Sequence, residues 1–221
     1  MPAYKNRMWD GKIRLFDLRK KTLYSGLYQY MQEFANARQY DIQPEPNRTY
    51  GLADTKNIID IPALLNEITL TAGGNKITPR DYQIAALEHA LTNGQSLLLS
   101  PTASGKSLII YLAIRHFLEE SDQSVLLIVP TTSLVEQMYS DFGDYSQFDE
   151  WEVTENCHKI YAGKEKYNVK PRVIITTWQS IYKERAEWFQ PFGMVVGDEA
   201  HAFKAKSLTS ILEKCTECRY R

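Results

Sequence analysis

The sequence has 221 residues, of which 43% are hydrophobic and 24% charged, and its formal net charge is -1. This composition is typical of a globular protein and excludes an overall electrostatic attraction to nucleic acid, so any such surface must come from local clustering of charge. The apolar runs are shorter than the roughly 20 residues of a membrane span. Three cysteines do not suffice for a disulfide framework. We therefore expect a cytoplasmic protein without a membrane segment. We also expect it to be monomeric, although nothing in the sequence indicates its oligomeric state.

Residues 1–45 are expected to form a small α+β domain. Asp10-Gly11 suits a tight turn, so the stretches on either side of it predict a β-hairpin. Four apolar residues then recur at helical spacing and predict a helix with its buried face: Leu27, Tyr30, Met31 and Phe34.

The start of the chain is basic. Residues 1–24 contain seven Lys and Arg against two Asp, a local charge of +5 by subtraction. Such a cluster, interleaved with aromatic residues, suits a nucleic-acid backbone. The alternative is an exposed, solvated hairpin face.

Residues 46–75 are expected to connect this domain to the next. Asp60 suits a helix N-cap, and Pro62 is tolerated in the first turn of a helix. Leucine and isoleucine residues over 61–68 supply an apolar face. Gly73-Gly74 is expected to stop this helix.

From residue 76 onward, short apolar runs alternate with longer amphipathic ones. Strands are predicted over 96–100, 124–130, 158–163, 172–178 and 194–199, and helices centre on 82–92, 106–120, 133–142, 179–187 and 207–214. Strands that are apolar throughout and separated by helices predict an α/β fold with a parallel sheet covered on both faces. Ligands of such sheets collect beyond the carboxyl ends of the strands.

The stretch "SPTASGKS", residues 100–107, follows one of these strands and opens a helix. Gly105-Lys106-Ser107 matches the end of the phosphate-binding pattern G-x-x-x-x-G-K-[ST], with Ser100 in place of its first glycine. Backbone N–H groups of such a loop favour an anion; Lys106 would reach the β- and γ-phosphates and Ser107 would ligate Mg²⁺. The loop residues expected to hold the phosphates are Thr102, Ala103, Ser104, Gly105, Lys106 and Ser107. The alternative is a polar strand-to-helix turn.

The stretch "MVVGDEAH" places two carboxylates at the end of another apolar strand. Asp198 at a strand end can hold the Mg²⁺ shell, while Glu199 can orient and deprotonate an attacking water. The alternative for this pair is a helix N-cap.

The order of "RDYQ", "SPTASGKS", "VPTTSLVEQ", "TTWQS" and "DEAH" over residues 76–221 resembles the first motor domain of superfamily 2 DEAH-box helicases and translocases, a RecA-like P-loop NTPase domain. With the leading "MWDGKIRLFD", the chain is similar to phage recombination helicases in which a small α+β domain precedes the motor. The resemblance implies ATP and Mg²⁺ as cofactors, DNA as partner, and an ATP-dependent helicase or translocase acting on branched DNA in recombination, fork remodelling and repair. It also implies the cytoplasm of a phage-infected bacterium.

The resemblance further implies roles for single residues. Gln83 matches the glutamine that reads adenine, with Arg80 or Tyr82 packing on the base; an amide can both donate to and accept from adenine. His201 matches the residue that links hydrolysis to the nucleic-acid motifs. The residues that match strand-contacting motifs are Thr131, Thr132, Gln137, Thr177 and Ser180. Helix capping is the alternative for Gln83 and for these hydroxyls. In the basic segment, the expected phosphate contacts are Lys12, Arg14 and Lys20.

The same resemblance implies three segments: a nucleic-acid-binding domain over 1–45, incomplete at its N-terminus, a connection over 46–75, and a motor domain over 76–221, incomplete at its C-terminus. A second RecA-like domain with arginine fingers is expected outside this sequence, so the chain alone should hydrolyse ATP poorly and not unwind DNA. A restriction-type translocase subunit, an RNA helicase and a non-catalytic nucleic-acid-binding module remain alternatives. Cys215 and Cys218 could form half of a zinc site, but no second ligand pair stands at metal spacing.

Overall fold

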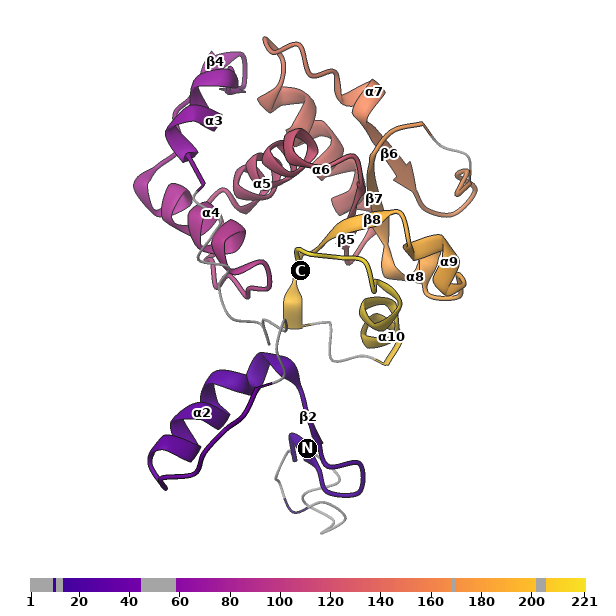
Figure 1. Cartoon of the computed structure of the whole chain (residues 1–221). Coiled ribbons are helices and arrows are strands. Elements are labelled where there is room, and N and C mark those ends of the chain that lie inside the picture. Colours follow the sequence, from indigo (N-terminus) through magenta and orange to yellow (C-terminus); the bar gives the residue numbers. More distant parts are fainter. Residues whose placement is uncertain (1–9, 11–13, 45–58, 168–169, 202–205) are drawn as a thin grey trace. The chain divides into compact units, whose positions relative to one another are not determined.

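The computed structural model describes residues 10, 14–44, 59–167, 170–201 and 206–221 (Figure 1). The chain divides into two compact units, Met1–Asp54 and Thr55–Arg221. The hairpin predicted around Gly11, and with it Lys12, lies outside the described residues.

The first unit contains a short hairpin further along the chain than the predicted one. Strand β1 (Phe16–Asp17) pairs antiparallel with β2 (Thr22–Leu23). Oδ1 of Asp17 accepts hydrogen bonds from the backbone N–H groups of Arg19 and Lys20, at 2.9 and 3.0 Å. An aspartate that bonds the backbone two residues onward forms a turn by itself, which explains a hairpin without a glycine at its tip.

A helical segment follows this hairpin. It consists of η1 (Ser25–Leu27) and α2 (Tyr28–Asn36). The helix was predicted correctly, but its buried face only in part, since Leu27 and Met31 are half-buried as expected. Tyr30 and Phe34 are 68% and 52% exposed, whereas Tyr28 and Ala35 are buried. A single helix beside a two-residue hairpin can bury only a narrow stripe, and Tyr28 and Ala35, seven residues apart, lie on that stripe.

The second unit is built on a four-stranded parallel sheet, which confirms the predicted α/β fold (Figure 1). The strand order is β6 (Cys157–Ile160), β7 (Val173–Thr177), β5 (Ser124–Val129) and β8 (Phe192–Gly197). In the central strand β5, Val125, Leu127 and Val129 belong to one hydrophobic cluster, and Leu126 and Ile128 belong to a second one on the other face. Both faces of the sheet are therefore covered, as near-continuous apolar strands require.

Helices cover the two faces of the sheet in two groups. The first hydrophobic cluster includes residues of α3 (Ile61–Glu67), α4 (Asp81–Asn93), α5 (Lys106–Glu120) and α6 (Thr132–Tyr145). The short α7 (Val153–Asn156) precedes β6. The second cluster includes residues of α8 (Trp178–Ile181), α9 (Ala186–Phe189) and α10 (Lys206–Lys214). The single helix predicted over 179–187 is thus wrong, because two short helices replace it. The break between them contains Glu184, whose carboxylate binds Lys166 at 3.0 Å.

The strand predicted over 96–100 is also wrong. Leu97 and Leu99 are 65% and 91% exposed. Only the start of this segment joins the sheet: Ser96 N–H donates to Arg221 O at 3.0 Å, and Arg221 N–H donates to Gly94 O at 2.8 Å. This bonding pattern is parallel, and Tyr220 in turn forms a parallel bridge with Met194 of β8. An apolar run becomes a strand only where a neighbouring backbone runs beside it, and the bonds of this kind in the described structure reach only Ser96.

The connection between the predicted domains is partly as expected. Asp60 caps α3, because its Oδ1 accepts from Ala63 N–H at 2.9 Å. Gly73 and Gly74 do not stop this helix, which ends at Glu67. They form the two-residue turn between β3 (Thr71–Ala72) and β4 (Asn75–Lys76), with φ of 57° and 75°. Two left-handed positions in succession are the geometry that a tight hairpin turn demands, and Gly-Gly supplies it.

The remaining sequence expectations concern membrane helices and the cysteines. Among the described residues, no helix is both long and apolar enough to cross a membrane. The three cysteines are buried and unbridged, and Cys218 donates through Sγ to Phe192 O at 3.0 Å. The described part of the chain contains no group of three or more His, Cys, Asp or Glu that could hold a metal.

Candidate nucleotide and nucleic-acid site

The loop of residues 100–107 is strongly curved where it enters α5. Gly105 is the N-cap of this helix, with φ 76° and ψ 40°, and Ala103 also has a positive φ of 62°. Left-handed residues at a helix start turn successive N–H groups toward one point, which favours an anion. Ser100 and Ser104 share a hydrogen bond between their hydroxyls. Ser100, which replaces the first glycine of the pattern, thus has a hydrogen-bond partner within the loop.

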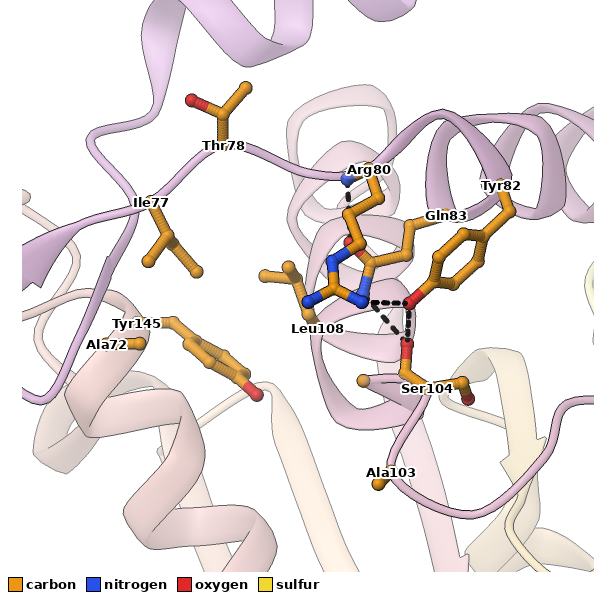
Figure 2. Close-up of a pocket in the computed structure, with 11 residues that line it drawn as sticks. Ala72, Ile77, Thr78, Arg80, Tyr82, Gln83, Ala103, Ser104, Leu108 and Tyr145 are labelled. Atoms are coloured by element: carbon orange, nitrogen blue, oxygen red, sulfur yellow. Dashed lines mark hydrogen bonds between the residues drawn. The ribbon is translucent and has the colours of Figure 1, made fainter.

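The first turn of α4 is hydrogen-bonded to this loop (Figure 2). Gln83 accepts through Oε1 from Arg80 N–H at 2.8 Å and donates through Nε2 to Ser104 O at 2.9 Å. Tyr82 donates its hydroxyl to the same Ser104 oxygen at 3.0 Å. A Cβ atom added at Gly105 would lie 2.4 Å from Gln83 Nε2. The structure therefore places Gln83 against the loop of residues 100–107, and the capping alternative holds in part because Gln83 also binds Arg80.

A pocket of about 370 Å³ opens beside this contact (Figure 2). Its lining residues are Ala72, Ile77, Thr78, Arg80, Tyr82, Gln83, Ala103, Ser104, Gly105, Leu108 and Tyr145. Apolar walls with a few convergent polar groups are typical of small-molecule sites of this size. The Gln83 amide retains one N–H and one lone pair beyond the two bonds above. The pocket can thus accept a flat heterocycle.

Sequence reasoning missed five residues of this pocket, which are Ala72, Ile77, Thr78, Leu108 and Tyr145. Three of them come from segments that are distant from the loop in sequence. Ala72 lies in strand β3 and Ile77 directly follows strand β4, whereas Tyr145 is the last residue of α6. No motif in the sequence marks them, because tertiary packing alone brings these segments to the loop.

Ser107 lies in the first turn of α5. Its Oγ and the Tyr145 hydroxyl share a hydrogen bond of 2.7 Å. Burial raises the pKa of the nearby Asp141 carboxyl, and a hydrogen bond from Ser107 opposes part of that rise. Sequence reasoning did not anticipate either partner of the predicted magnesium ligand.

The predicted carboxylates lie directly after β8. Asp198 N–H donates to Ile128 O at 2.9 Å, so the ladder with β5 continues up to this residue. Glu199 N–H donates to Asp198 Oδ1 at 2.9 Å, and Glu199 has a positive φ of 56°. Non-glycine residues in this backbone region cost free energy and cluster at functional sites. His201 Nδ1 is 3.2 Å from Glu199 Oε2.

The loop of residues 100–107 and the turn at Asp198 lie at the same end of the parallel strands. The segment over 94–96 runs parallel to Arg221, and Tyr220 runs parallel to β8, as described above. Both loops therefore follow the carboxyl ends of parallel segments. Hydroxyl and carboxylate oxygens are the ligands that Mg²⁺ prefers. Ser107 and Asp198 carry oxygens of this kind, and Gly105 has no room for a side chain because Gln83 lies against it.

The residues that match strand-contacting motifs follow two adjacent strands. Thr131 comes after β5 and Thr177 ends β7, and β5 and β7 pair directly, with Val129 opposite Thr177. Thr131 caps α6 by accepting from Leu134 N–H at 3.3 Å, so the capping alternative holds for this residue. Thr177 and Ser180 share a hydrogen bond of 3.0 Å between their hydroxyls. Thr132 and Gln137 are exposed on α6.

The predicted basic contacts lie in the first unit. Arg14 forms an ion pair with Asp10, and both side chains are well exposed. The hydrogen bond and the charge of Asp10 raise the pKa of Arg14. Lys20 is exposed, and only its backbone takes part in the turn made by Asp17.

Comparison with known proteins identifies the family to which this chain belongs. The family described as "Type III restriction enzyme, res subunit" matches residues 76–220. The ATP-dependent DNA helicase uvsW of Enterobacteria phage T4 is 34% identical over 225 residues, which covers 100% of this chain and 43% of the relative. The ATP-dependent DNA helicase Hel308 of Pyrococcus abyssi is 28% identical over 159 residues, which covers 70% of this chain and 22% of the relative.

Solved structures agree with these matches. The crystal structure of the UvsW helicase from bacteriophage T4 is similar with a TM-score of 0.81 and 33% identity, over 99% of this chain and 76% of that one. The chain spans less than half the length of the curated relatives just named. The likeness to UvsW confirms that the second unit has the RecA-like fold. The chain thus belongs to the type III restriction enzyme res-subunit family, and over its whole length it is similar to the UvsW helicase.

Proposed function

We propose that this chain provides the ATP–Mg²⁺ site and part of the DNA-binding surface of an ATP-dependent DNA helicase or translocase. The observation that carries the proposal is the left-handed loop at Gly105, closed by Gln83, at the sheet edge where Asp198 and Glu199 follow β8. The names of the relatives, both ATP-dependent DNA helicases, support it.

Each residue of the site has a proposed role in hydrolysis. Lys106 and the backbone N–H groups of the loop bind the phosphates. Ser107 and Asp198 hold Mg²⁺, which neutralises the charge on the phosphate oxygens when bound. Glu199 orients the attacking water and takes its proton. His201, whose Nδ1 lies 3.2 Å from Glu199 Oε2, has the proposed role of linking this base to the strand-contacting residues.

The base and ribose are proposed to enter the pocket beside the loop. Gln83 uses its remaining N–H and lone pair on the adenine edge, and the Arg80 guanidinium packs on the ring. Ile77 and Leu108 supply apolar contact.

The DNA is proposed to pass over the carboxyl ends of β5 and β7. Hydroxyls and helix N-termini at these ends suit phosphate oxygens and carry little sequence information. The residues involved are Thr131, Thr132, Gln137, Thr177 and Ser180. Lys12, Arg14 and Lys20 of the first unit add phosphate contacts. We further propose a branched DNA substrate. The proposed location is the cytoplasm of an infected bacterium, which the phage source of the uvsW relative supports.

The test is DNA-stimulated ATPase activity of the full-length protein that contains this chain. Lys106→Ala and Glu199→Gln should each lower the rate by about a hundredfold or more, since each removes charge stabilisation or base catalysis. Glu187→Gln, an exposed carboxyl after β7, is the matched control and should leave the rate unchanged. Full activity in both site variants would refute the proposed site.

A second measurement separates the alternatives. Unwinding of branched DNA, with little activity on single-stranded RNA, supports the DNA helicase; ATP-driven translocation without unwinding supports a restriction-type translocase. DNA binding without any ATPase activity supports a non-catalytic module.

The basic segment is tested by salt titration of DNA binding. Replacing Lys12, Arg14 and Lys20 by alanine should reduce the slope of log K against log salt by about one for each DNA phosphate that the variant no longer neutralises. An unchanged slope removes the first unit from the DNA-binding surface.

A further inference from the structure

Tyr145 occupies a position that joins the pocket to the phosphate-binding loop. Its side chain lines the pocket, and its hydroxyl lies 2.7 Å from Ser107 Oγ, although the two residues are 38 positions apart in sequence. Its ring packs against Tyr111, with centroids 5.6 Å apart and planes inclined at 55°. The phenol thus approaches the start of α5 from the end of a different helix.

The end of α6 that bears Tyr145 is held by a third element. The adjacent Asp144 accepts through its backbone oxygen from the Thr71 hydroxyl. Its carboxylate accepts from Gly73 N–H, at 2.9 Å to Oδ2 and 3.0 Å to Oδ1. The β3–β4 hairpin therefore fixes the last turn of α6, and with it the position of the Tyr145 hydroxyl.

A serine that ligates a metal uses an oxygen lone pair, so its hydroxyl proton must point to another acceptor. A serine side chain also has three staggered rotamers. Its oxygen keeps one direction only when an interaction fixes one of these rotamers. Tyr145 supplies a hydrogen-bond partner for Ser107 that can both accept and donate. A hydrogen bond with such a partner restricts the rotation of the Ser107 hydroxyl before Mg²⁺ binds.

We propose that Tyr145 is a positioning residue of the nucleotide site, which holds the Ser107 hydroxyl in the orientation that Mg²⁺ requires. This inference rests on the proposed function, because it takes Ser107 as a magnesium ligand. Tyr145 touches Ser107 and acts through it.

The experiment measures binding of a fluorescent ATP analogue to the full-length protein, in Mg²⁺ and in EDTA. Tyr145→Phe keeps the ring against Tyr111 and removes only the hydroxyl. Affinity in Mg²⁺ should fall about three- to tenfold, the effect of one hydrogen bond, while affinity in EDTA stays unchanged. Tyr139→Phe, on the same helix but outside the pocket lining, is the matched control and should change neither affinity.

Two outcomes would overturn the inference. An equal fall in Mg²⁺ and in EDTA would mean that Tyr145 only supports the pocket, and no change in either condition would mean that its hydroxyl does not matter. In a double-mutant cycle, adding Tyr145→Phe to Ser107→Ala should cause no further loss of affinity in Mg²⁺, because the two residues act as one unit.

Ser107→Ala separates the inference from the function on which it rests. If Ser107→Ala leaves the Mg²⁺-dependent gain in affinity intact, the proposed nucleotide site is wrong. If Ser107→Ala removes this gain but Tyr145→Phe has no effect, only the role of Tyr145 is wrong.

Discussion

Gln83 Nε2 donates to Ser104 O at 2.9 Å, and this bond ties the first turn of α4 to the loop of residues 100–107. Both residues are buried, at 6% and 7% exposure. The same oxygen also accepts from Tyr82, so the loop carbonyl has two donors. Either donor alone can satisfy this oxygen, but the loss of both leaves a buried acceptor without a protein donor.

This redundancy predicts the outcome of removing the donors. Gln83→Ala and Tyr82→Phe should each lower the free energy of unfolding by about 1 kcal/mol, and the double variant should lose more than their sum. Urea denaturation of the three variants measures this coupling. Strict additivity would show that the two donors do not share their acceptor in solution.

Gly105 predicts a second effect on the same loop. Gly105→Ala would combine a φ of 76° with a Cβ only 2.4 Å from Gln83 Nε2, so it should destabilise the loop and weaken ATP-analogue binding by at least about tenfold. Gly163→Ala is the matched control: its φ is 83°, yet a Cβ there would meet nothing within 4 Å. The control should lose stability from backbone strain but keep its nucleotide affinity. Equal affinity losses in both variants would exclude the clash as the cause.

Arg115 predicts a large effect on stability away from the site. Its guanidinium forms an ion pair with Asp149, and both side chains are only about a tenth exposed, at 10% and 11%. Arg115→Met should lower the free energy of unfolding by about 3–5 kcal/mol, because it leaves a buried carboxylate unpaired.

The control for this ion pair is a more exposed one. Lys159 and Glu136 are 2.7 Å apart, with side chains 23% and 49% exposed. Lys159→Met should cost less than about 1 kcal/mol, since solvent screens the pair. Chemical denaturation of both variants measures their free energies of unfolding. Equal losses of stability in Arg115→Met and Lys159→Met would contradict the argument that burial makes the first ion pair more important.

Glu184 predicts a pH dependence of stability. Burial alone would raise the pKa of this carboxyl, but hydrogen bonds from Tyr167 and Lys166 and the charge of Lys214 hold its pKa below the usual 4.5. A carboxyl with a lowered folded-state pKa stabilises the protein above its unfolded-state pKa, and this contribution disappears as the pH falls through the folded-state value. The difference in unfolding free energy between the native chain and Glu184→Gln should thus be full at pH 6 and shrink below about pH 4.5.

Unfolding measured from pH 6 to pH 3 tests this dependence. Glu187→Gln, three residues further on and exposed, is the control for a general charge effect. The difference in unfolding free energy between the native chain and Glu184→Gln could instead stay constant across this range. That result would show that the neighbouring groups do not lower the pKa of the Glu184 carboxyl.

Local patterns in the sequence predicted the features that local interactions decide. Asp60 was placed correctly as an N-cap because a capping bond spans three residues. Strands β5, β7 and β8 were predicted because near-continuous apolar runs can only be buried on both faces. The loop before α5 was recognised from Gly105, Lys106 and Ser107 because its backbone geometry depends on neighbouring residues.

Features that depend on distant segments were missed. Leu97 and Leu99 look like strand residues, but whether they become one depends on a backbone from the other end of the unit. The buried face of α2 depends on how much of the helix its small unit can cover. Tyr145 reaches Ser107 only because α6 packs against α5, a contact that no spacing along the chain encodes.

The bonds of Arg221 with Gly94 and Ser96 also bear on the order of folding. They close a loop of more than a hundred residues, and contacts of such sequence separation form slowly because the entropy of closure is lost first. During synthesis on the ribosome, the helices and the central strands can assemble while this edge stays open. The segment that leads into the loop of residues 100–107 would then be secured after the central strands, so hydrogen exchange during refolding should protect Ser96 and Arg221 after the amides of β5.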